Sequence, residues 1–304
     1  MLVIHVLRQV AEVLSNLGNC KPYHKLERNG VYPSERIVYR DKFTHTFVWK
    51  MTHDPSVDRH IYYDIPAWNA NGSKIIFMST RPGTGTGFWV MDANGSNIRE
   101  LKFSKEGMRF RPPIFWSNRD PNKVFFVMED EEKTEIISMD ILSGKMKTLG
   151  KIYEPGFDMM PPSPDDRKII LRKKCYGVGC FYEEDRIYVL DVDTSLIRRV
   201  PIAGRIHRIR FTKAPDYSIF FNRNNPRTMW IININCSGLR KLRDGGVHPD
   251  WNPNGDECSF FDRGLRILDL EFMDERVLVE GINGHGGWKR ELCSMRPQQF
   301  ISGA

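Results

Sequence analysis

The sequence predicts an all-β fold, a β-propeller of six to seven four-stranded blades with a short N-terminal helix. The first observation behind this prediction is a repeat of an apolar anchor, a tight polar turn and a strand-like run. It recurs at intervals of roughly 40 residues, the length of one propeller blade. The second is composition: within each repeat, runs of β-branched and aromatic residues are bounded by Asn, Asp, Gly and Pro, the pattern of strands and turns.

Residues 1–34 are predicted to form an amphipathic helix and a linker before the propeller, which spans residues 35–304. Their apolar residues recur at helical spacing, and Gly18 is a suitable stop. These apolar residues are Leu2, Val6, Val10, Val13, Leu14 and Leu17. Arg8 and Glu12 interrupt the run and no small-residue cleavage site follows, which disfavours a signal peptide. No stretch is long enough to span a membrane, so a cytoplasmic protein is expected.

The clearest repeat, residues 64–101, shows how one blade is built. Asn71-Gly72 supplies the positive φ angles that a two-residue hairpin needs, and the apolar strand of residues 75–77 follows it. Residues 88–91 give a third strand, and a polar turn leads to a fourth that ends in Arg-Glu-Leu. Further repeats begin at Pro113, Pro162, Phe211, Trp251 and, in degenerate form, Trp288.

Residues 35–51 contain two further strands that lack an inner strand of their own. They are residues 36–39 and 46–50, and we expect them to complete the last blade. At the other end, residues 284–304 lack the usual turn. Either this segment closes a six-bladed ring with the N-terminal strands, or the chain is a fragment of a longer one.

Composition and charge narrow the function classes. An apolar fraction of 40% with 12% aromatic residues is enough for a sizeable core. The net charge of +7 comes from scattered basic residues without a nucleic-acid-binding module, so nucleic acid is not an expected partner. The six cysteines match no zinc spacing. Cys175 and Cys180 flank a loop in which a disulfide is sterically conceivable, and free thiols in a reducing compartment are the simpler interpretation.

Several short motifs resemble those of known propellers. The repeat in residues 64–101 resembles that of TolB-type propellers, a likeness that concerns the fold and says little about activity. From about Tyr32 onward, the order of motifs resembles the oligogalacturonate lyase family. These motifs are Tyr39-Arg40-Asp41, His60-Ile61-Tyr62-Tyr63, Trp68, His207-Arg208-Ile209-Arg210-Phe211, Trp230-Ile231-Ile232-Asn233 and His248-Pro249-Asp250-Trp251.

The resemblance implies an enzyme that cleaves short pectin fragments by β-elimination, with a divalent metal, typically manganese, in the channel. It implies His207 as the general base and His248 as a metal ligand. The family's other ligands lie on a late blade, where His285 has an equivalent place without the family's Gln-x-x-His-x-His context. The acidic, histidine-rich stretch that follows the base strand in the family is replaced here by Asn-Arg-Asn-Asn at residues 222–225.

The spacing of the histidines also points to one site without reference to the family. His207, His248 and His285 each precede the inner-strand anchor of a repeat by a few residues, a place that opens into one mouth of a propeller channel. Imidazole is a good ligand for manganese-like ions, and its pKa suits proton abstraction. The candidate metal ligands are therefore His248 and His285, and the candidate base is His207.

Basic and aromatic residues near these histidines suit an anionic sugar. β-Elimination from a uronate needs positive charge that stabilises the developing enolate, and arginines can neutralise the substrate carboxylate. We assign His207, Arg205 and Arg210 to catalysis, and His60, Tyr62 and Arg208 to substrate binding, with the aromatic ring stacked on a sugar. Two other interpretations remain open: the histidines bond neighbouring blade backbones, or they line a polar funnel that binds without a metal.

The sequence thus predicts a carbohydrate-active propeller that binds or cleaves anionic oligouronides by metal-assisted β-elimination, with a divalent ion, expected to be Mn²⁺, as cofactor. An active protein of this kind is a carbon–oxygen lyase. The alternative is a non-catalytic TolB-like propeller that acts as a protein-binding scaffold. The expected partner is an acidic oligosaccharide or a protein, and no membrane partner is expected.

Overall fold

The computed structural model describes residues 30–62, 65–81, 86–174, 184–212, 217–224, 226–252 and 254–281. Every regular element in these ranges is a strand, and no helix in them is long and apolar enough to cross a membrane. The predicted N-terminal helix falls in residues 1–29 and the sixth repeat begins at Trp288, so both lie outside the described residues.

The prediction of an all-β propeller is confirmed, but the described residues form five blades where six to seven were expected. The difference arises because residues 35–51 stand as a separate two-stranded sheet, and the sixth repeat lies outside the described ranges. The strands of blade 1 are β4 (Asp58–Arg59), β5 (Lys74–Ser79), β6 (Gly87–Asp92), β7 (Ile98–Glu100) and β1 (Val31–Tyr32). Strand β1 lies in the segment predicted as a linker, residues 1–34. It pairs with β7 and so adds a fifth strand to the sheet of blade 1.

Blades 2 to 5 have four antiparallel strands each, in chain order from the inside outward. Blade 2 consists of β8 (Arg109–Trp116), β9 (Lys123–Glu129), β10 (Thr134–Asp140) and β11 (Met146–Ile152), and blade 3 of β12 (Asp158–Met159), β13 (Lys168–Lys173), β14 (Arg186–Asp191) and β15 (Ile197–Val200). Blade 4 consists of β16 (Ile206–Phe211), β17 (Ile219–Asn224), β18 (Arg227–Ile232) and β19 (Arg240–Asp244), and blade 5 of β20 (Val247–Trp251), β21 (Glu257–Phe261), β22 (Gly264–Asp269) and β23 (Glu275–Glu280).

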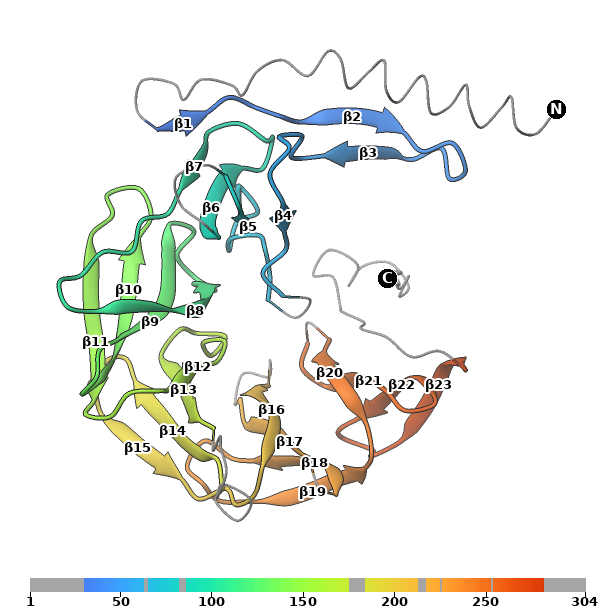
Figure 1. The fold of residues 1–304 in the computed structure, drawn as a ribbon. Coiled ribbons are helices and arrows are strands. Elements are labelled where there is room, and N and C mark those ends of the chain that lie inside the picture. Colours follow the sequence, from blue (N-terminus) through green and yellow to red (C-terminus); the bar gives the residue numbers. More distant parts are fainter. Residues whose placement is uncertain are drawn as a thin grey trace, which may run out of the picture. The chain divides into compact units, whose positions relative to one another are not determined.

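The chain divides into two compact units, residues 1–58 with 78–101, and residues 59–77 with 102–304. In the second unit, blades 2 to 5 follow one another around a common centre, with β8, β12, β16 and β20 innermost (Figure 1).

The glycines of the predicted Asn-Gly turns have positive φ, 70° at Gly72 and 83° at Gly255, but Asn71 does not. These positive φ angles are the reason that glycine is needed there. The first of these turns is wider than the two-residue hairpin that was predicted, because the N–H of Asn69 donates to the carbonyl oxygen of Lys74 at 3.0 Å.

Apolar contacts between neighbouring blades form the core of this unit. On β13, Ile169 and Leu171 pack in the cluster shared with blade 2, whereas Ile170 packs in the cluster shared with blade 4. On β17, Phe221 faces blade 3 and Phe220 faces blade 5. Successive side chains of a strand point to opposite faces, so a strand buried on both faces is apolar at every position. Each such side chain contributes about 1.5–3 kcal/mol by burial.

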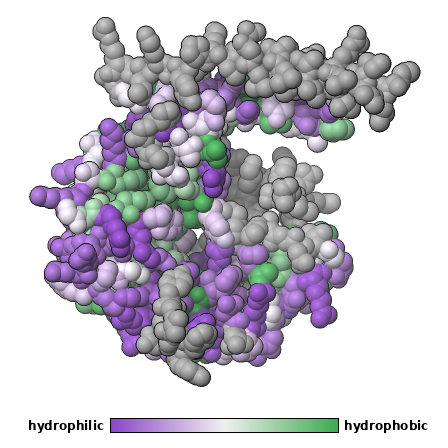
Figure 2. Space-filling view, viewed as in Figure 1, coloured by the Kyte–Doolittle hydropathy of each residue, from purple (hydrophilic) through white to green (hydrophobic). Residues whose placement is uncertain are grey.

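The separate hairpin of β2 (Ile37–Arg40) and β3 (Phe47–Lys50) belongs to the first unit and has a different surface. Nearly all of its strand residues are exposed, including Tyr39 and Trp49. Figure 2 shows hydrophobic residues at the surface of this hairpin beside hydrophilic ones. The third strands of blades 2 to 5 bury most of their apolar side chains, whereas those of β2 are exposed.

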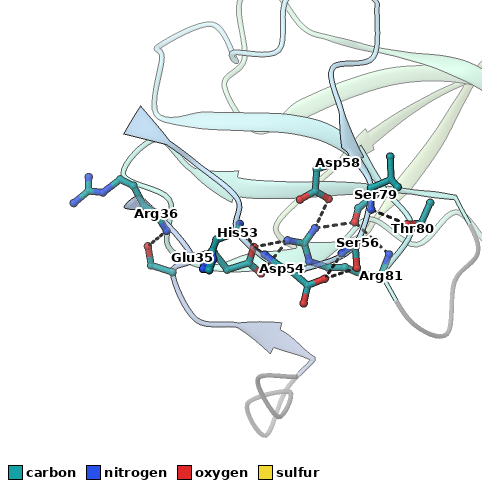
Figure 3. A network of polar contacts seen from close by, with 11 residues as sticks. Glu35, Arg36, His53, Asp54, Ser56, Asp58, Ser79, Thr80 and Arg81 are labelled. Carbon is teal, nitrogen blue, oxygen red and sulfur yellow. Dashed lines mark hydrogen bonds and ion pairs between the residues drawn. The ribbon is translucent and has the colours of Figure 1, made fainter. Parts of the chain in front are cut away.

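A buried arginine ties together the segments around this hairpin within the first unit. The guanidinium of Arg81 donates to both carboxylate oxygens of Glu35, at 2.9 and 2.8 Å, and to Asp58 Oδ1 at 2.7 Å (Figure 3). Glu35 Oε2 also accepts the backbone N–H groups of His53 and Asp54. The Arg81 side chain is fully buried, so this network fixes the chain on both sides of the hairpin.

Candidate functional site

Two of the predicted functional histidines lie at irregularities of innermost strands. On β16 the register with β17 passes from Ile206 directly to Arg208, so His207 sits in a bulge. On β20 the register with β21 is interrupted between Val247 and Asp250, and His248 there has a φ of 51°. Bulges re-aim side chains and are frequent next to functional sites. The two histidines are thus displayed by adjacent blades of the second unit.

The surroundings of His207 favour a neutral imidazole. Burial by nearby protein lowers the pKa of His207, and the positive charges of Arg208, His248, Arg227 and Arg172 lower it further. His207 is nevertheless exposed to solvent. A neutral imidazole at pH 7 has a lone pair available to accept a proton or a hydrogen bond.

Arg208 and Tyr62 come together although they lie far apart in the sequence. The Arg208 guanidinium donates to the Tyr62 hydroxyl at 3.1 Å and lies 5.0 Å from the centre of the ring. Tyr62 is 46% exposed. Arg208 is itself partly exposed, so the pair lies at the surface. The structure therefore brings together two of the residues predicted for substrate binding.

Arg210 and Arg205 occupy different environments. Arg210 is buried and forms an ion pair of 3.1 Å with Asp250 of β20, so it joins blade 4 to blade 5. Arg205 is exposed just before β16, and its carbonyl oxygen accepts the Asn224 N–H at 3.0 Å. Of the two arginines predicted for catalysis, Arg210 is thus engaged between two blades and Arg205 lies at the surface.

The described residues do not supply a manganese site. No group of three or more His, Cys, Asp or Glu side chains in the described ranges is arranged to hold a metal ion. Asp250, two residues after His248, has its carboxylate in the ion pair with Arg210. His285, the second predicted ligand, lies outside the described residues, and His60 is exposed on the segment that precedes Tyr62.

Sequence reasoning missed the arginines that shape this site from other strands. Arg172, at the end of β13, donates to the carbonyl oxygens of Ile206 and His207 at 3.2 Å each, and so holds the bulge. Its other neighbour is Asp158, which also pairs with Arg111 at 2.8 Å. The sequence offered only a weak signal, the charged residue directly after the apolar run of residues 169–171, because the run of residues 219–221 is followed by polar residues as well.

Comparison with solved structures shows similar folds. An oligogalacturonate lyase in complex with manganese matches with a TM-score of 0.68 and 17% identity, over 84% of this chain and 76% of that chain. An oligogalacturonate lyase from Vibrio parahaemolyticus gives a TM-score of 0.70 and 14% identity, over 86% of this chain and 76% of that chain. A putative TolB from Agrobacterium tumefaciens gives a TM-score of 0.55 and 15% identity, over 84% of this chain and 94% of that chain.

No family model matches the chain, and no curated protein matches it either. At these identities the likeness concerns the fold alone. The chain is a β-propeller similar in structure to the propellers of oligogalacturonate lyase and TolB.

Proposed function

We propose that the protein binds an anionic oligouronide at the face formed by His207, Arg208 and Tyr62. The observation that carries this proposal is the guanidinium of Arg208 held over the exposed ring of Tyr62. A sugar ring stacks on an aromatic face, and a guanidinium recognises a carboxylate with two parallel hydrogen bonds. One uronate unit offers both features, which a neutral sugar does not.

The electrostatics of the surrounding residues support an anionic ligand. His207 has four basic neighbours that disfavour its charged form, and an anionic group placed there relieves this repulsion. Three carboxylates lie on neighbouring segments: Asp158 and Asp250 are in ion pairs with arginines, and Asp185 accepts the N–H of Ile206 at 2.9 Å. The ion pairs of Asp158 and Asp250 reduce the repulsion that a ligand carboxylate would meet.

Elimination is the reaction that these side chains are suited to if the bound uronate reacts. The neutral imidazole of His207 takes the proton from the carbon next to the carboxylate, and Arg208 stabilises the negative charge that develops on the carboxylate. The electron pair of the broken C–H bond forms a C=C bond, and the glycosidic oxygen on the neighbouring carbon leaves and takes a proton from water. No step is assigned to manganese, because the described residues do not form a site for it.

Calorimetric titration with trigalacturonate tests the binding proposal. Arg208→Gln removes a charged hydrogen bond worth about 1.5–3 kcal/mol, so affinity falls roughly tenfold to more than a hundredfold. Arg199→Gln is the matched control, because Arg199 is an exposed arginine on β15, the outermost strand of blade 3. Equal loss in both variants, or no loss in either, contradicts binding at this face.

Near-ultraviolet absorbance of an unsaturated uronate product tests elimination separately. With oligogalacturonate and added Mn²⁺, we expect any increase in absorbance to be abolished in His207→Gln. Absorbance that stays constant in the wild-type protein, while calorimetry shows binding, rejects elimination and leaves the binding proposal intact.

A non-catalytic scaffold remains the second proposal, supported by a different observation. The exposed apolar residues of the β2–β3 hairpin form a surface that suits a protein partner. Because it belongs to the first unit and the uronide face to the second, each of the two proposals is tested separately.

A further inference from the structure

The β2–β3 hairpin exposes apolar side chains on both of its faces. In the described part of the chain it is a sheet of two strands only, and each strand has one edge that pairs with no other strand. Large apolar side chains on it are between 40% and 81% exposed. They are Ile37, Val38, Tyr39, Phe43, Phe47 and Trp49. A two-stranded hairpin alone is at best marginally stable in water, so these strands are suited to a larger sheet.

The turn of this hairpin is the turn that joins the third and fourth strands of other blades. Asp41 Oδ1 accepts the N–H groups of Phe43 and Thr44, at 3.0 and 2.7 Å, and His45 has a positive φ of 57°. The same pattern occurs in blades 2, 3 and 5. In each, the side chain of an aspartate accepts the N–H groups of the second and third residues after it, and the fourth residue after it has a positive φ. The aspartates are Asp140, Asp191 and Asp269, and the positive-φ residues are Gly144, Ser195 and Met273.

This equivalence identifies β2 as a third strand whose second-strand neighbour is missing among the described residues. In blade 3, the third strand β14 pairs with β13 on one side and with β15 on the other. The Asp41 N–H donates to the Thr46 carbonyl at 2.8 Å, so Tyr39 and Ile37 also point their backbone groups toward β3. By alternation, the N–H and C=O groups of Val38 and Arg40 point to the side away from β3, where no described strand pairs with β2.

The charge of the hairpin restricts what can occupy that side. Arg36, Arg40, Lys42 and Lys50 are the cationic residues of residues 36–50, against the single carboxylate of Asp41. Hydrogen bonds from Thr44 lower the pKa of Asp41, so this carboxylate is engaged in the turn. Residues 282–304 carry three basic residues and one acidic residue, and a second copy of the hairpin carries the same cations. Both are poor electrostatic partners for this edge.

An anionic lipid surface would complement the positive charge of the hairpin, but it would not provide hydrogen-bond partners for the backbone groups of β2. Lipid tails cannot accept or donate hydrogen bonds, so an unpaired strand edge placed in them leaves the Val38 and Arg40 groups unsatisfied.

We propose that β2 is a docking edge for an acidic, partly apolar strand of a protein partner. The partner strand adds antiparallel beside Val38 and Arg40, in the place that β9, β13 and β21 have in blades 2, 3 and 5. Strand addition of this kind draws affinity from backbone bonds and specificity from side chains.

A peptide taken from blade 2 provides a defined probe. Residues 122–132 contain the second strand β9 followed by acidic residues, and a fluorescein-labelled peptide of this sequence mimics the proposed partner. Fluorescence anisotropy with the full chain is expected to show binding that weakens with salt. The same peptide with Asn and Gln in place of its acidic residues is expected to bind at least fivefold more weakly.

Val38→Pro tests the edge directly, because it removes a backbone donor that faces outward while the bonds to β3 stay intact. We expect at least a tenfold loss of peptide affinity, and little change in Val38→Thr, which keeps the N–H. Lys50→Glu leaves the backbone unchanged and is expected to weaken binding severalfold and to reduce its salt dependence. Equal binding by wild type and Val38→Pro, or no binding by wild type, overturns the proposal.

Amide hydrogen exchange of residues 37–40 separates the other occupants. Fast exchange in the purified protein that slows when the peptide is added supports the proposal. Slow exchange in the protein alone means that the edge is already covered, by the chain itself if it is monomeric or by a second copy if it is dimeric, and overturns the proposal. Binding to phosphatidylserine vesicles that Val38→Pro leaves unchanged overturns it in favour of a membrane surface.

Discussion

Arg81→Met removes the positive charge from the buried network of the first unit and leaves a side chain of similar length. Glu35, whose side chain is 2% exposed, is then left in the protein interior without its cation. The loss of one partner of a buried ion pair costs about 3–5 kcal/mol. Contacts of the guanidinium with the Trp89 ring at 5.4 Å and the Tyr32 ring at 5.8 Å are lost as well, which places the effect in the upper part of this range.

Urea unfolding of the full chain, followed by tryptophan fluorescence and by amide exchange of residues 86–101, measures this loss. The expected result is an earlier transition for the first unit, with faster exchange in β6 and β7 than in blades 2 to 5. Arg81→Met combined with Glu35→Gln is the second arm of a double-mutant cycle. We expect it to recover at least about 1 kcal/mol, because Glu35 no longer places a carboxylate without its cation in the interior, although Asp58 still lacks its partner. A single variant as stable as the wild type, or no recovery in the double variant, refutes the reasoning.

Three further perturbations test the second unit. Arg210→Met leaves Asp250 without its cation, and because both side chains keep some solvent contact we expect a loss of about 1–2 kcal/mol in urea unfolding; an unchanged midpoint contradicts the role of this ion pair. A hydrogen bond from Lys168 lowers the pKa of Asp191 to about 2. This stabilisation is present above the unfolded-state pKa and is lost as the pH falls through the folded-state value. Asp191→Asn should therefore cost about 1–2 kcal/mol at neutral pH, and this cost should shrink as the pH falls toward and below 2, in unfolding titrations across that range. Gly264→Ala places a methyl group against a backbone carbonyl of β23, and we expect a loss of about 1–3 kcal/mol with faster amide exchange in blade 5; wild-type exchange there refutes this.

The fold followed from the sequence because its signals are local and repeated. Turn glycines such as Gly72 need a positive φ, and a strand such as residues 169–171 is apolar at every position because blades cover both of its faces. These features recur once per blade, so each repeat reinforces the prediction. The number of blades was harder to predict, since it depends on how many repeats pair into sheets, and a degenerate copy such as the one at Trp288 carries a weak signal.

The site was predictable only in part. The places of His207 and His248 before their strand anchors indicated the innermost strands, and Tyr62 and Arg208 do come together. The bulges at both histidines left no recognisable sequence pattern, because a bulge is a matter of register with the neighbouring strand. The pairing of Arg210 with Asp250 also depends on how adjacent blades meet, so alternation along one strand did not reveal it.

Titration of His207 by nuclear magnetic resonance, with and without trigalacturonate, tests the central claim most directly. We expect the pKa of His207 in the free protein to lie below the ordinary histidine value, because burial and basic neighbours disfavour the charged ring. A bound uronate adds negative charge beside the ring, so the pKa of His207 is expected to rise on saturation, and to rise less in Arg208→Gln. An ordinary or raised pKa in the free protein, or a pKa that saturating ligand leaves unchanged, contradicts an anion-binding face at His207.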